Sequence, residues 1–319
     1  MSSAADAAGA GTPGAGRAPA PDPAVRRRAA VLGSPIAHSL SPVLHRAAYR
    51  RLGLADWRYD AYEVTEAQLP GFVAGLGREW AGLSLTMPLK RAILPLLAET
   101  GGTARSVDAV NTVLRRPDGT LRGENTDVPG LVAALAERGV TTARSAAVLG
   151  GGATAASALA ALSVLVNGPY ALGEAPGIGS AARGEVSIYL RSPARAAELQ
   201  PVAAAHGVDL RVRPWSAAAE ALGADLVVNT TPAGAADELA DAVPDRVATL
   251  FDVLYHPWPT ALAAAWAKHD GTILGGQDLL VHQAVLQVDL MTADEVLPGE
   301  RPDAAALLAA MRAALADLD

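Results

Sequence analysis

The stretch Ala146-Ala147-Val148-Leu149-Gly150-Gly151-Gly152-Ala153-Thr154-Ala155-Ala156 decides the fold of this 319-residue chain. An apolar run ends in three glycines, and an alanine-rich helical pattern follows at once. Gly150, Gly152 and Ala155 match G-x-G-x-x-G/A, the strand-to-helix turn that places a dinucleotide pyrophosphate at a helix N-terminus. The match alone does not establish a cofactor site, because a chain with 31 glycines brings some together by chance.

Strand and helix patterns alternate after this turn. Ligand-type residues such as Asn229 and Thr230 stand at the carboxyl ends of the expected strands. This alternation is typical of a doubly wound parallel sheet, so we expect an α/β fold with a Rossmann-type domain. The expected strands are Ala146–Leu149, Val186–Leu190, Leu210–Val212, Asp225–Asn229 and Thr249–Val253, and the expected helices are Thr154–Val166, Ala194–His206 and Ser216–Leu222.

The first third of the chain mixes strands and helices as well. Asp118-Gly119, flanked by apolar residues, is a hairpin turn signal. Ser41 followed by Pro42 predicts a helix start with Ser41 as the N-cap. The expected strands are Ala29–Gly33, Trp57–Val64 and a strand around Leu83–Thr86, and the expected helices are Ser41–Leu52, Glu66–Arg78 and Arg91–Glu99.

These patterns predict two domains after a disordered tail. Residues 1–24 are rich in Ala, Gly, Pro and Ser and carry no secretory-signal pattern. Residues 25–126 form the expected substrate-binding and catalytic domain, and residues 127–275 form the expected dinucleotide-binding domain. Two C-terminal helices within 276–319 are expected to complete the first domain, because the nucleotide fold already has its strands.

Composition excludes several classes of protein. The net charge is −7 and the pI is about 5.4, so neither a nucleic-acid nor an anionic-membrane partner is expected. The absence of cysteine excludes disulfides and thiolate metal sites, and it is compatible with a cytoplasmic location. The six histidines form no H-E-x-x-H cluster, so no metal site is expected.

The scarcity of lysine singles out Lys90. Only two of the 26 basic residues are lysines, Lys90 and Lys268. Lys90 follows a strand end, where α/β proteins bind ligands, so a function is favoured over plain surface charge.

Ser39 and Ser41 are either helix caps, which the local sequence favours, or a hydroxyl pair that binds a carboxylate. Asp127 is either the N-cap of a helix over Gly130–Arg138 or a functional carboxylate.

Taken together, these clusters resemble the shikimate dehydrogenase family, which includes quinate/shikimate dehydrogenases. The resemblance covers Val31 to about Met291. Seven motifs stand in the family's order, which makes the resemblance specific. They are Gly33–Pro42, Gly82–Lys90, Ala109–Val113, Gly123–Gly130, Gly150–Ala155, Asn229–Gly234 with Tyr255–Thr260, and Gly276–Gln283.

The resemblance implies reversible NADPH-dependent reduction of 3-dehydroshikimate to shikimate, in the chorismate branch of aromatic amino-acid biosynthesis. It implies an active site in the cleft between the two domains, with Lys90 and Asp127 as the catalytic pair. The implied substrate-binding residues are Ser39, Ser41, Thr86, Asn111, Tyr255 and Gln283. The implied NADP-binding residues are Gly150, Gly151, Gly152, Ala153, Thr154, Arg191, Ser192, Arg195, Asn229, Thr230, Val253 and Gly276.

Three departures from the family pattern bear on these roles. Ser84 stands where the family motif Asn-Val-Thr-x-Pro-x-Lys has Asn, and Leu190 stands where Asn-Arg-Thr has its Asn. Arg191 lies 41 residues after Gly150, about twice the usual spacing, with the excess in a loop over Asn167–Glu185. Glu174 falls near the usual spacing of an NAD-selecting acid, but no strand precedes it. Arg191 is the better selector, so NADP is favoured over NAD.

Two alternatives stay open. An NAD-using quinate/shikimate dehydrogenase differs in cofactor and substrate, and Ser41 in place of a bulkier Thr favours shikimate. A nucleotide-sensing relative without activity would not need both Lys90 and Asp127. A serine hydrolase is not supported, because G-x-S-x-G is absent. A homodimer is compatible with the sequence, which does not determine the oligomeric state.

Overall fold

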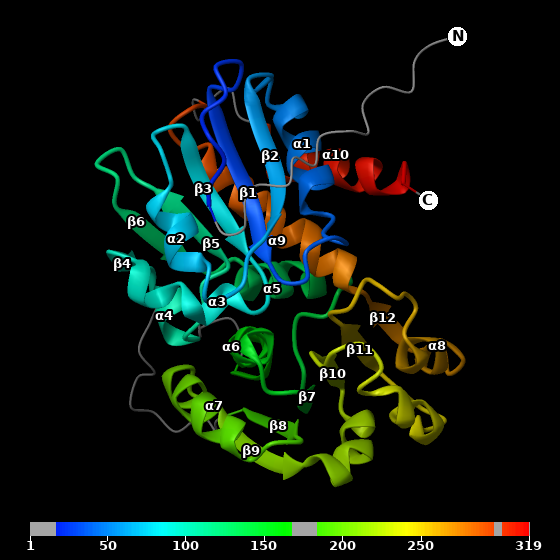
Figure 1. Ribbon diagram of the computed structural model, residues 1–319. Helices are drawn as coiled ribbons and strands as arrows, with labels where there is room; N and C mark the ends of the chain where they lie inside the picture. Colours follow the sequence, from blue (N-terminus) through cyan, green and yellow to red (C-terminus); the bar gives the residue numbers. More distant parts are fainter. Residues whose placement is uncertain (1–16, 168–183, 297–301, 319) are drawn as a thin grey trace. The chain divides into compact units, whose positions relative to one another are not determined.

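The computed structural model describes residues 17–167, 184–296 and 302–318 (Figure 1). Most of the expected tail, most of the expected loop over Asn167–Glu185 and its Glu174 lie outside the described residues. The chain divides into two compact units. The first unit is Met1–Thr100, Val110–Glu124 and Gln287–Asp319, and the second is Gly101–Ala109 and Asn125–Leu286.

The second unit is built on a parallel sheet of six strands in the order β12-β11-β10-β7-β8-β9. Counted from β7 as the first strand, this is the order 3-2-1-4-5-6 of the doubly wound dinucleotide-binding fold, which confirms the expected fold class. The order reverses between β7 and β10. The strands are β7 (Ala146–Leu149), β8 (Glu185–Leu190), β9 (Asp209–Pro214), β10 (Leu226–Asn229), β11 (Thr249–Asp252) and β12 (Thr272–Leu274).

Helices cover both faces of this sheet, because both faces of its central strand are apolar. In β7, Ala146 and Val148 belong to one buried cluster, whereas Ala147 and Leu149 belong to another that includes Trp266. The first face is covered by α5 (Asp127–Glu137), α6 (Ala153–Asn167) and α7 (Ala194–Ala205). The other is covered by the 3-10 helices η3 (Trp215–Gly223) and η4 (Asp237–Ala242) and by α8 (Ala261–Ala267).

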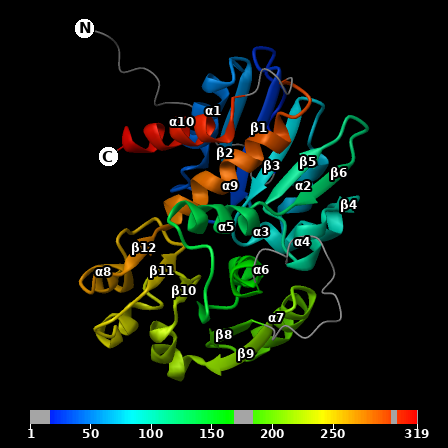
Figure 2. The ribbon, with the colours of Figure 1, turned by 180° about the vertical axis from the view of Figure 1, so that it is seen from behind.

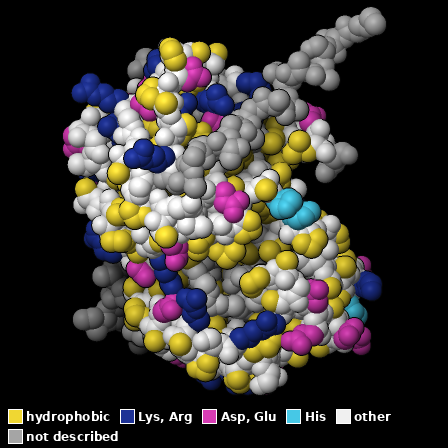
Figure 3. Space-filling view, in the orientation of Figure 1, with side chains coloured by type: hydrophobic (Ala, Val, Ile, Leu, Met, Phe, Trp, Pro, Cys, Tyr) yellow, Lys and Arg dark blue, Asp and Glu magenta, His cyan; other side chains and the backbone are white. Residues whose placement is uncertain are grey.

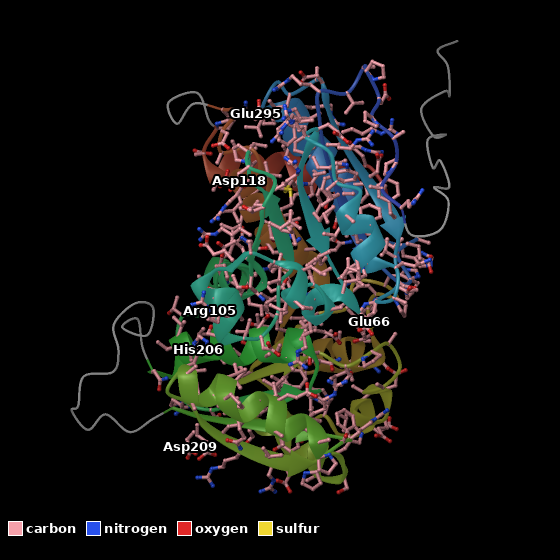
Figure 4. All side chains as sticks on the ribbon, turned by 60° about the vertical axis from the view of Figure 1, so that its left-hand side comes forward. Glu66, Arg105, Asp118, His206, Asp209 and Glu295 are labelled. Atoms are coloured by element: carbon pink, nitrogen blue, oxygen red, sulfur yellow. The ribbon has the colours of Figure 1, made fainter. Side chains whose placement is uncertain are left out.

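The first unit contains a mixed sheet of six strands in the order β2-β1-β3-β5-β6-β4. Gly119 has a φ of +89° and Asp118 accepts a hydrogen bond from the Thr120 amide, which confirms the expected hairpin between β5 and β6 (Figure 4). The strands are β1 (Arg27–Gly33), β2 (Trp57–Glu63), β3 (Trp80–Leu85), β4 (Glu99–Thr100), β5 (Thr112–Arg115) and β6 (Leu121–Glu124).

Helices from both ends of the chain pack on this sheet. The last helix packs against the first (Figure 2). A continuous helix that starts in the second unit ends beside β3, where Met291 faces Gly82. The first-unit helices are α1 (Ser41–Arg51), α2 (Leu69–Ala74), α3 (Leu89–Ala92), η1 (Leu94–Leu96) and α10 (Ala304–Ala316). α4 (Gly102–Ser106) belongs to the second unit, and α9 (Gly276–Met291) runs from the second unit into the first.

Two expected helices are corrected by the structure. The helix expected over Arg91–Glu99 is instead α3, η1 and β4. Pro95 explains the break, because proline lacks an amide donor and disfavours helical backbone in the residue before it. The helix expected over Glu66–Arg78 is only α2, which has Pro70 in its first turn and ends at Gly75.

Two expected N-caps are also corrected. α1 begins at Ser41 itself, since Leu40 already has helical backbone angles and serves as the N-cap without a side-chain bond. Pro42 lies in the first turn, as expected. Asp127 is likewise the first residue of α5 and Thr126 is its N-cap. Both polar side chains therefore lie inside the first turn of a helix.

The glycine turn generates a prediction about stability. Gly150 has a φ of +107°, and a Cβ added to it would lie 2.6 Å from Thr230 Oγ1. A Cβ on Gly152 would meet no atom of the described residues within 4 Å. We expect Gly150→Ala to lower the free energy of unfolding by about 1–3 kcal/mol, and Gly152→Ala to leave it nearly unchanged. Denaturant unfolding of both variants checks this, and equal losses would contradict it.

Candidate active site

The glycine turn lies at the point where the strand order of the parallel sheet reverses. The Gly150 amide donates to the Tyr189 carbonyl over 3.1 Å, which ties the turn to β8. The Thr230 hydroxyl donates to the Leu149 carbonyl over 2.8 Å, which ties the residue after β10 to the end of β7. The two loops that flank the switch point are therefore held in contact, where such folds bind their ligand.

The three glycines have different surroundings. Gly150 is packed against Thr230, and a Cβ on Gly151 would lie 2.7 Å from Leu190 Cδ2. Of the three positions, only Gly152 has room for a Cβ, because no atom of the described residues lies within 4 Å of it. It directly precedes α6, whose N-terminus carries positive partial charge. A phosphate group fits this arrangement, because the backbone can approach it closely there.

Asn229 is held by a buried carboxylate that sequence reasoning missed. Its Nδ2 donates to Asp252 Oδ2 over 3.1 Å, and its Oδ1 accepts from the Thr231 hydroxyl over 2.7 Å. Asp252 also accepts from the Thr260 hydroxyl over 2.7 Å and from the Leu254 amide over 3.2 Å. Asp252 thus joins the segments after β10 and β11 to the start of α8. Burial raises the pKa of this carboxyl above its ordinary value.

The remaining cofactor candidates continue along the same sheet edge. The Val253 amide donates to the Asn229 carbonyl over 3.0 Å. Gly276 packs so closely on the Val253 carbonyl that a Cβ there would overlap it. The ends of β7, β10 and β11 and the start of α9 therefore follow one another along one edge, which brings Gly150, Thr230, Val253 and Gly276 to neighbouring strand ends.

Arg191, Ser192 and Arg195 follow β8 and are exposed. The Arg191 Nη2 donates to the Ala235 carbonyl over 2.6 Å, and its guanidinium carbon lies 4.8 Å from the centre of the Trp215 ring. Arg195 forms an ion pair with Glu198 over 2.9 Å. This end of the sheet therefore presents guanidinium groups to solvent.

In the first unit, two predicted substrate residues and the predicted catalytic lysine lie at one sheet edge. The Thr86 amide donates to the Leu32 carbonyl over 2.9 Å, so β3 and β1 end side by side. The Lys90 carbonyl accepts from the Val110 amide over 2.8 Å, which sets Asn111 close to the start of α3. The structure therefore brings Thr86, Lys90 and Asn111 together.

A buried amide that sequence reasoning missed supports Asn111. Gln287 Nε2 donates to the Asn111 carbonyl over 3.1 Å and to the Thr112 hydroxyl over 3.0 Å, and that hydroxyl donates to Asn111 Oδ1 over 2.9 Å. Gln287 Oε1 accepts from Ser84 over 2.8 Å and from His45 Nε2 over 3.2 Å. A signal for Gln287 exists, because it lies one helical turn after Gln283 on α9.

Ser84, the departure from the family motif, is a member of the same network. The Tyr59 phenol donates to the Ser84 hydroxyl over 2.7 Å, and Ser41 also hydrogen-bonds with Tyr59. Burial raises the pKa of Tyr59 far above its ordinary value. A continuous buried chain of polar groups thus runs from Ser41 through Tyr59, Ser84 and Gln287 to Asn111. Ser39 is half-buried and its hydroxyl accepts from the Ser41 amide over 3.4 Å.

The other substrate candidates belong to the second unit. Asp127 is buried at the start of α5. Gln283 donates to the Leu280 carbonyl over 2.9 Å, and its Oε1 accepts from Thr126 over 3.5 Å. Tyr255 is half-buried, and burial raises its pKa above the ordinary value. Lys90 and Asp127 lie in different units, so their pairing stays a prediction.

The surface charge, the length of the helices and the grouping of acidic and histidine side chains show which membrane and metal features the described residues have. Figure 3 shows basic and acidic side chains mixed over the visible face. Among the described residues, no helix has the length and apolar character needed to cross a bilayer, and no cluster of His, Asp and Glu could hold a metal ion.

The sheet order and the glycine turn at its switch point define the second unit as a dinucleotide-binding α/β domain. Residues 31–113, most of which belong to the first unit, match the family described as "Shikimate dehydrogenase substrate binding domain". The chain therefore joins a substrate-binding domain to a dinucleotide-binding one, as two-domain dehydrogenases do.

Similarity to known proteins extends over nearly the whole chain. The chain belongs to the shikimate dehydrogenase family. It is 36% identical to the Thermus thermophilus protein named "Shikimate dehydrogenase (NADP(+))", over 90% of this chain and 98% of that protein. The shikimate dehydrogenase structure from Mycobacterium tuberculosis is 37% identical, with a TM-score of 0.75 over 90% of this chain and 99% of that one. A Thermus thermophilus structure in complex with NADP(H) and shikimate is 32% identical, with a TM-score of 0.70 and coverages of 90% and 99%.

The buried network generates a prediction about pH and stability. Burial lowers the pKa of His45 from 6.5 to about 3. The unfolded chain therefore binds a proton that the folded chain excludes, and stability falls as the pH drops through this window. We expect this group to contribute a slope of up to about 1.4 kcal/mol per pH unit. Denaturant unfolding between pH 7.5 and 4.5 should show a flatter profile for His45→Gln.

His206 provides the comparison variant. It lies at the end of α7, where its Nε2 and the Ser106 hydroxyl are 2.9 Å apart (Figure 4). Burial lowers its pKa as well, but its side chain is only partly buried. His206→Gln should therefore flatten the profile less than His45→Gln. Parallel profiles for His45→Gln and the unchanged protein would contradict the assignment.

Proposed function

We propose that this chain catalyses the reversible NADP-dependent reduction of 3-dehydroshikimate to shikimate, in aromatic amino-acid (chorismate) biosynthesis. The observation that carries the proposal is the gathering of Thr86, Lys90 and Asn111 at one sheet edge of the first unit. Support comes from the relatives named NADP-dependent shikimate dehydrogenase and from the neighbour solved with NADP(H) and shikimate. We propose a cytoplasmic location for this reaction.

The proposed substrate-binding residues match the functional groups of the substrate. Ser39 and Ser41 hold the carboxylate with hydroxyl donors. The ring hydroxyls are held by Thr86, Lys90, Asn111, Asp127 and Gln283, with Tyr255 beside the substrate. A buried hydroxyl left without a partner would weaken binding. The network through Tyr59, Ser84 and Gln287 supports this set, since it limits the rotation of Ser41 and Asn111.

Lys90 and Asp127 are the proposed catalytic pair. NADPH, when bound, supplies the hydride to the carbonyl carbon. Negative charge then develops on the carbonyl oxygen, and the ammonium group of Lys90 stabilises it and supports its protonation. Asp127 orients Lys90 and balances its charge. In the reverse direction the same pair assists the loss of the hydroxyl proton.

The proposed cofactor site follows the sheet edge of the second unit. Gly150, Gly151 and Gly152, with Ala153 and Thr154 at the start of α6, bind the pyrophosphate. Arg191, Ser192 and Arg195 bind the ribose 2′-phosphate. Asn229, Thr230, Val253 and Gly276 line the rest of the site. In this proposal residues 25–126, completed by residues 276–319, form the substrate-binding and catalytic domain, and residues 127–275 form the dinucleotide-binding domain.

The first kinetic prediction concerns cofactor and substrate choice. Of the four combinations of shikimate or quinate with NADP or NAD, we expect shikimate with NADP to give the highest kcat/KM, because a guanidinium group binds a phosphate dianion far better than a hydroxyl. Initial rates of NADPH or NADH formation measure this. Equal values with NADP and NAD would contradict the assignment of Arg191, and a preference for quinate would favour the alternative enzyme.

The second kinetic prediction concerns Lys90. Lys90→Ala should lower kcat by about 10²- to 10⁴-fold, the usual contribution of a proton-transferring side chain, with a smaller change in the KM for NADP. Lys268, the other lysine of the chain, is exposed at the end of α8 and provides the matched control. Lys268→Ala should keep full activity. A Lys90→Ala enzyme with normal kcat would overturn the proposed mechanism.

A further inference from the structure

Arg191 is held from two sides by groups that carry no net charge. Its guanidinium carbon lies 4.8 Å from the centre of the Trp215 ring, and its Nη2 donates to the Ala235 carbonyl over 2.6 Å. Trp215 is the first residue of η3, directly after β9, and Ala235 precedes η4. Two segments far from Arg191 in the sequence thus define the direction of its side chain.

Trp215 is itself fixed in place. Its indole Nε1 donates to Glu238 Oε1 over 2.8 Å, and its ring packs against the buried cluster that includes Leu149 and Trp266. A ring anchored at both its polar and its apolar side offers a rigid face. The Arg191 guanidinium group lies over this face, so the ring limits the positions that the group can take.

Neighbouring arginines differ from Arg191 in their partners. Arg195 pairs with Glu198 over 2.9 Å, Arg211 pairs with Glu185 over 2.6 Å, and Arg213 pairs with Glu220. Each of those arginines has a carboxylate as its partner. The indole and the carbonyl orient Arg191 without neutralising it, so its charge stays available for an anionic ligand.

We propose that Trp215 is a positioning residue that sets the preference for a dinucleotide bearing a ribose 2′-phosphate. It acts through Arg191, by holding the guanidinium group in the direction in which it pairs with the phosphate. The inference rests on the proposed NADP-dependent function and deepens it. The cofactor without the phosphate has a neutral hydroxyl at this position, so it gains much less from an oriented guanidinium group.

The test compares cofactors in the full-length enzyme. Trp215→Leu removes the ring and keeps an apolar side chain, and we expect it to lower the ratio of kcat/KM with NADP to kcat/KM with NAD by about tenfold, within the range of one cation–π contact. The KM for shikimate should change little. Glu238→Gln keeps a carbonyl acceptor for the indole and should keep the ratio. An unchanged ratio in Trp215→Leu overturns the proposal.

A double-mutant cycle separates orientation of Arg191 from a direct contact of Trp215 with the cofactor. In an Arg191→Ala background, Trp215→Leu should cause no further fall in the ratio. A further fall of the same size in that background overturns the proposal. Trp215→Phe retains a ring but loses the bond to Glu238, and it gives an intermediate ratio. It also provides the measurement if Trp215→Leu does not fold.

Binding of nucleotide fragments keeps this test independent of the proposed reaction. Calorimetric titration with 2′,5′-ADP and 5′-AMP should show weaker binding of 2′,5′-ADP to Trp215→Leu and little change for 5′-AMP. Equal weakening of both fragments overturns the role of Trp215. An unmodified enzyme that prefers 2′,5′-ADP but does not oxidise shikimate would contradict the proposed function and leave the role of Trp215 supported.

Discussion

The backbone at Gly150 is the constraint on which the second unit depends. Its φ of +107° turns the chain from β7 toward α6, and its missing Cβ leaves room for the Thr230 hydroxyl. That hydroxyl in turn bonds the carbonyl of Leu149. A single residue type thus satisfies a backbone requirement and a contact between two loops. The glycine therefore determines where α6 begins and how far apart the ends of β7 and β10 lie.

Beyond this turn, each unit uses one buried polar side chain to join its strand ends. Asp252 accepts hydrogen bonds from Asn229, Thr260 and the Leu254 amide. Gln287 makes four hydrogen bonds, to Ser84, His45, Thr112 and the Asn111 carbonyl. Such groups tolerate burial because their polar atoms are paired. Asp252 and Gln287 hold Asn229 and Asn111, which we propose to contact ligands.

Local sequence patterns predicted five of the six strands of the second unit, because short apolar runs bounded by glycine and polar residues have few alternatives. They missed β12, because a run of three residues is too short to indicate a strand. The first-unit helices were less predictable. The start of α1 depends on the backbone of Leu40, and Pro95 divides what reads as one apolar helix. The spacing from Gln283 indicates the helix face of Gln287, but it does not identify Ser84 as the partner, because the two residues are 203 positions apart. Asp252 and Trp215 were missed for the same reason, because their roles arise only from partners brought close by folding.

The network also explains how the chain accommodates Ser84 in place of the Asn of the family motif. Every residue of β3 is buried, and the Ser84 hydroxyl already accepts from Tyr59 and donates to Gln287. A longer amide at this position would displace one of these partners, and that partner would lose a buried hydrogen bond. The phenol of Tyr59 reaches the short Ser84 hydroxyl over 2.7 Å, so both groups stay hydrogen-bonded. Ser84, Tyr59 and Gln287 therefore form one buried hydrogen-bonded set, and a change at any of the three affects the other two.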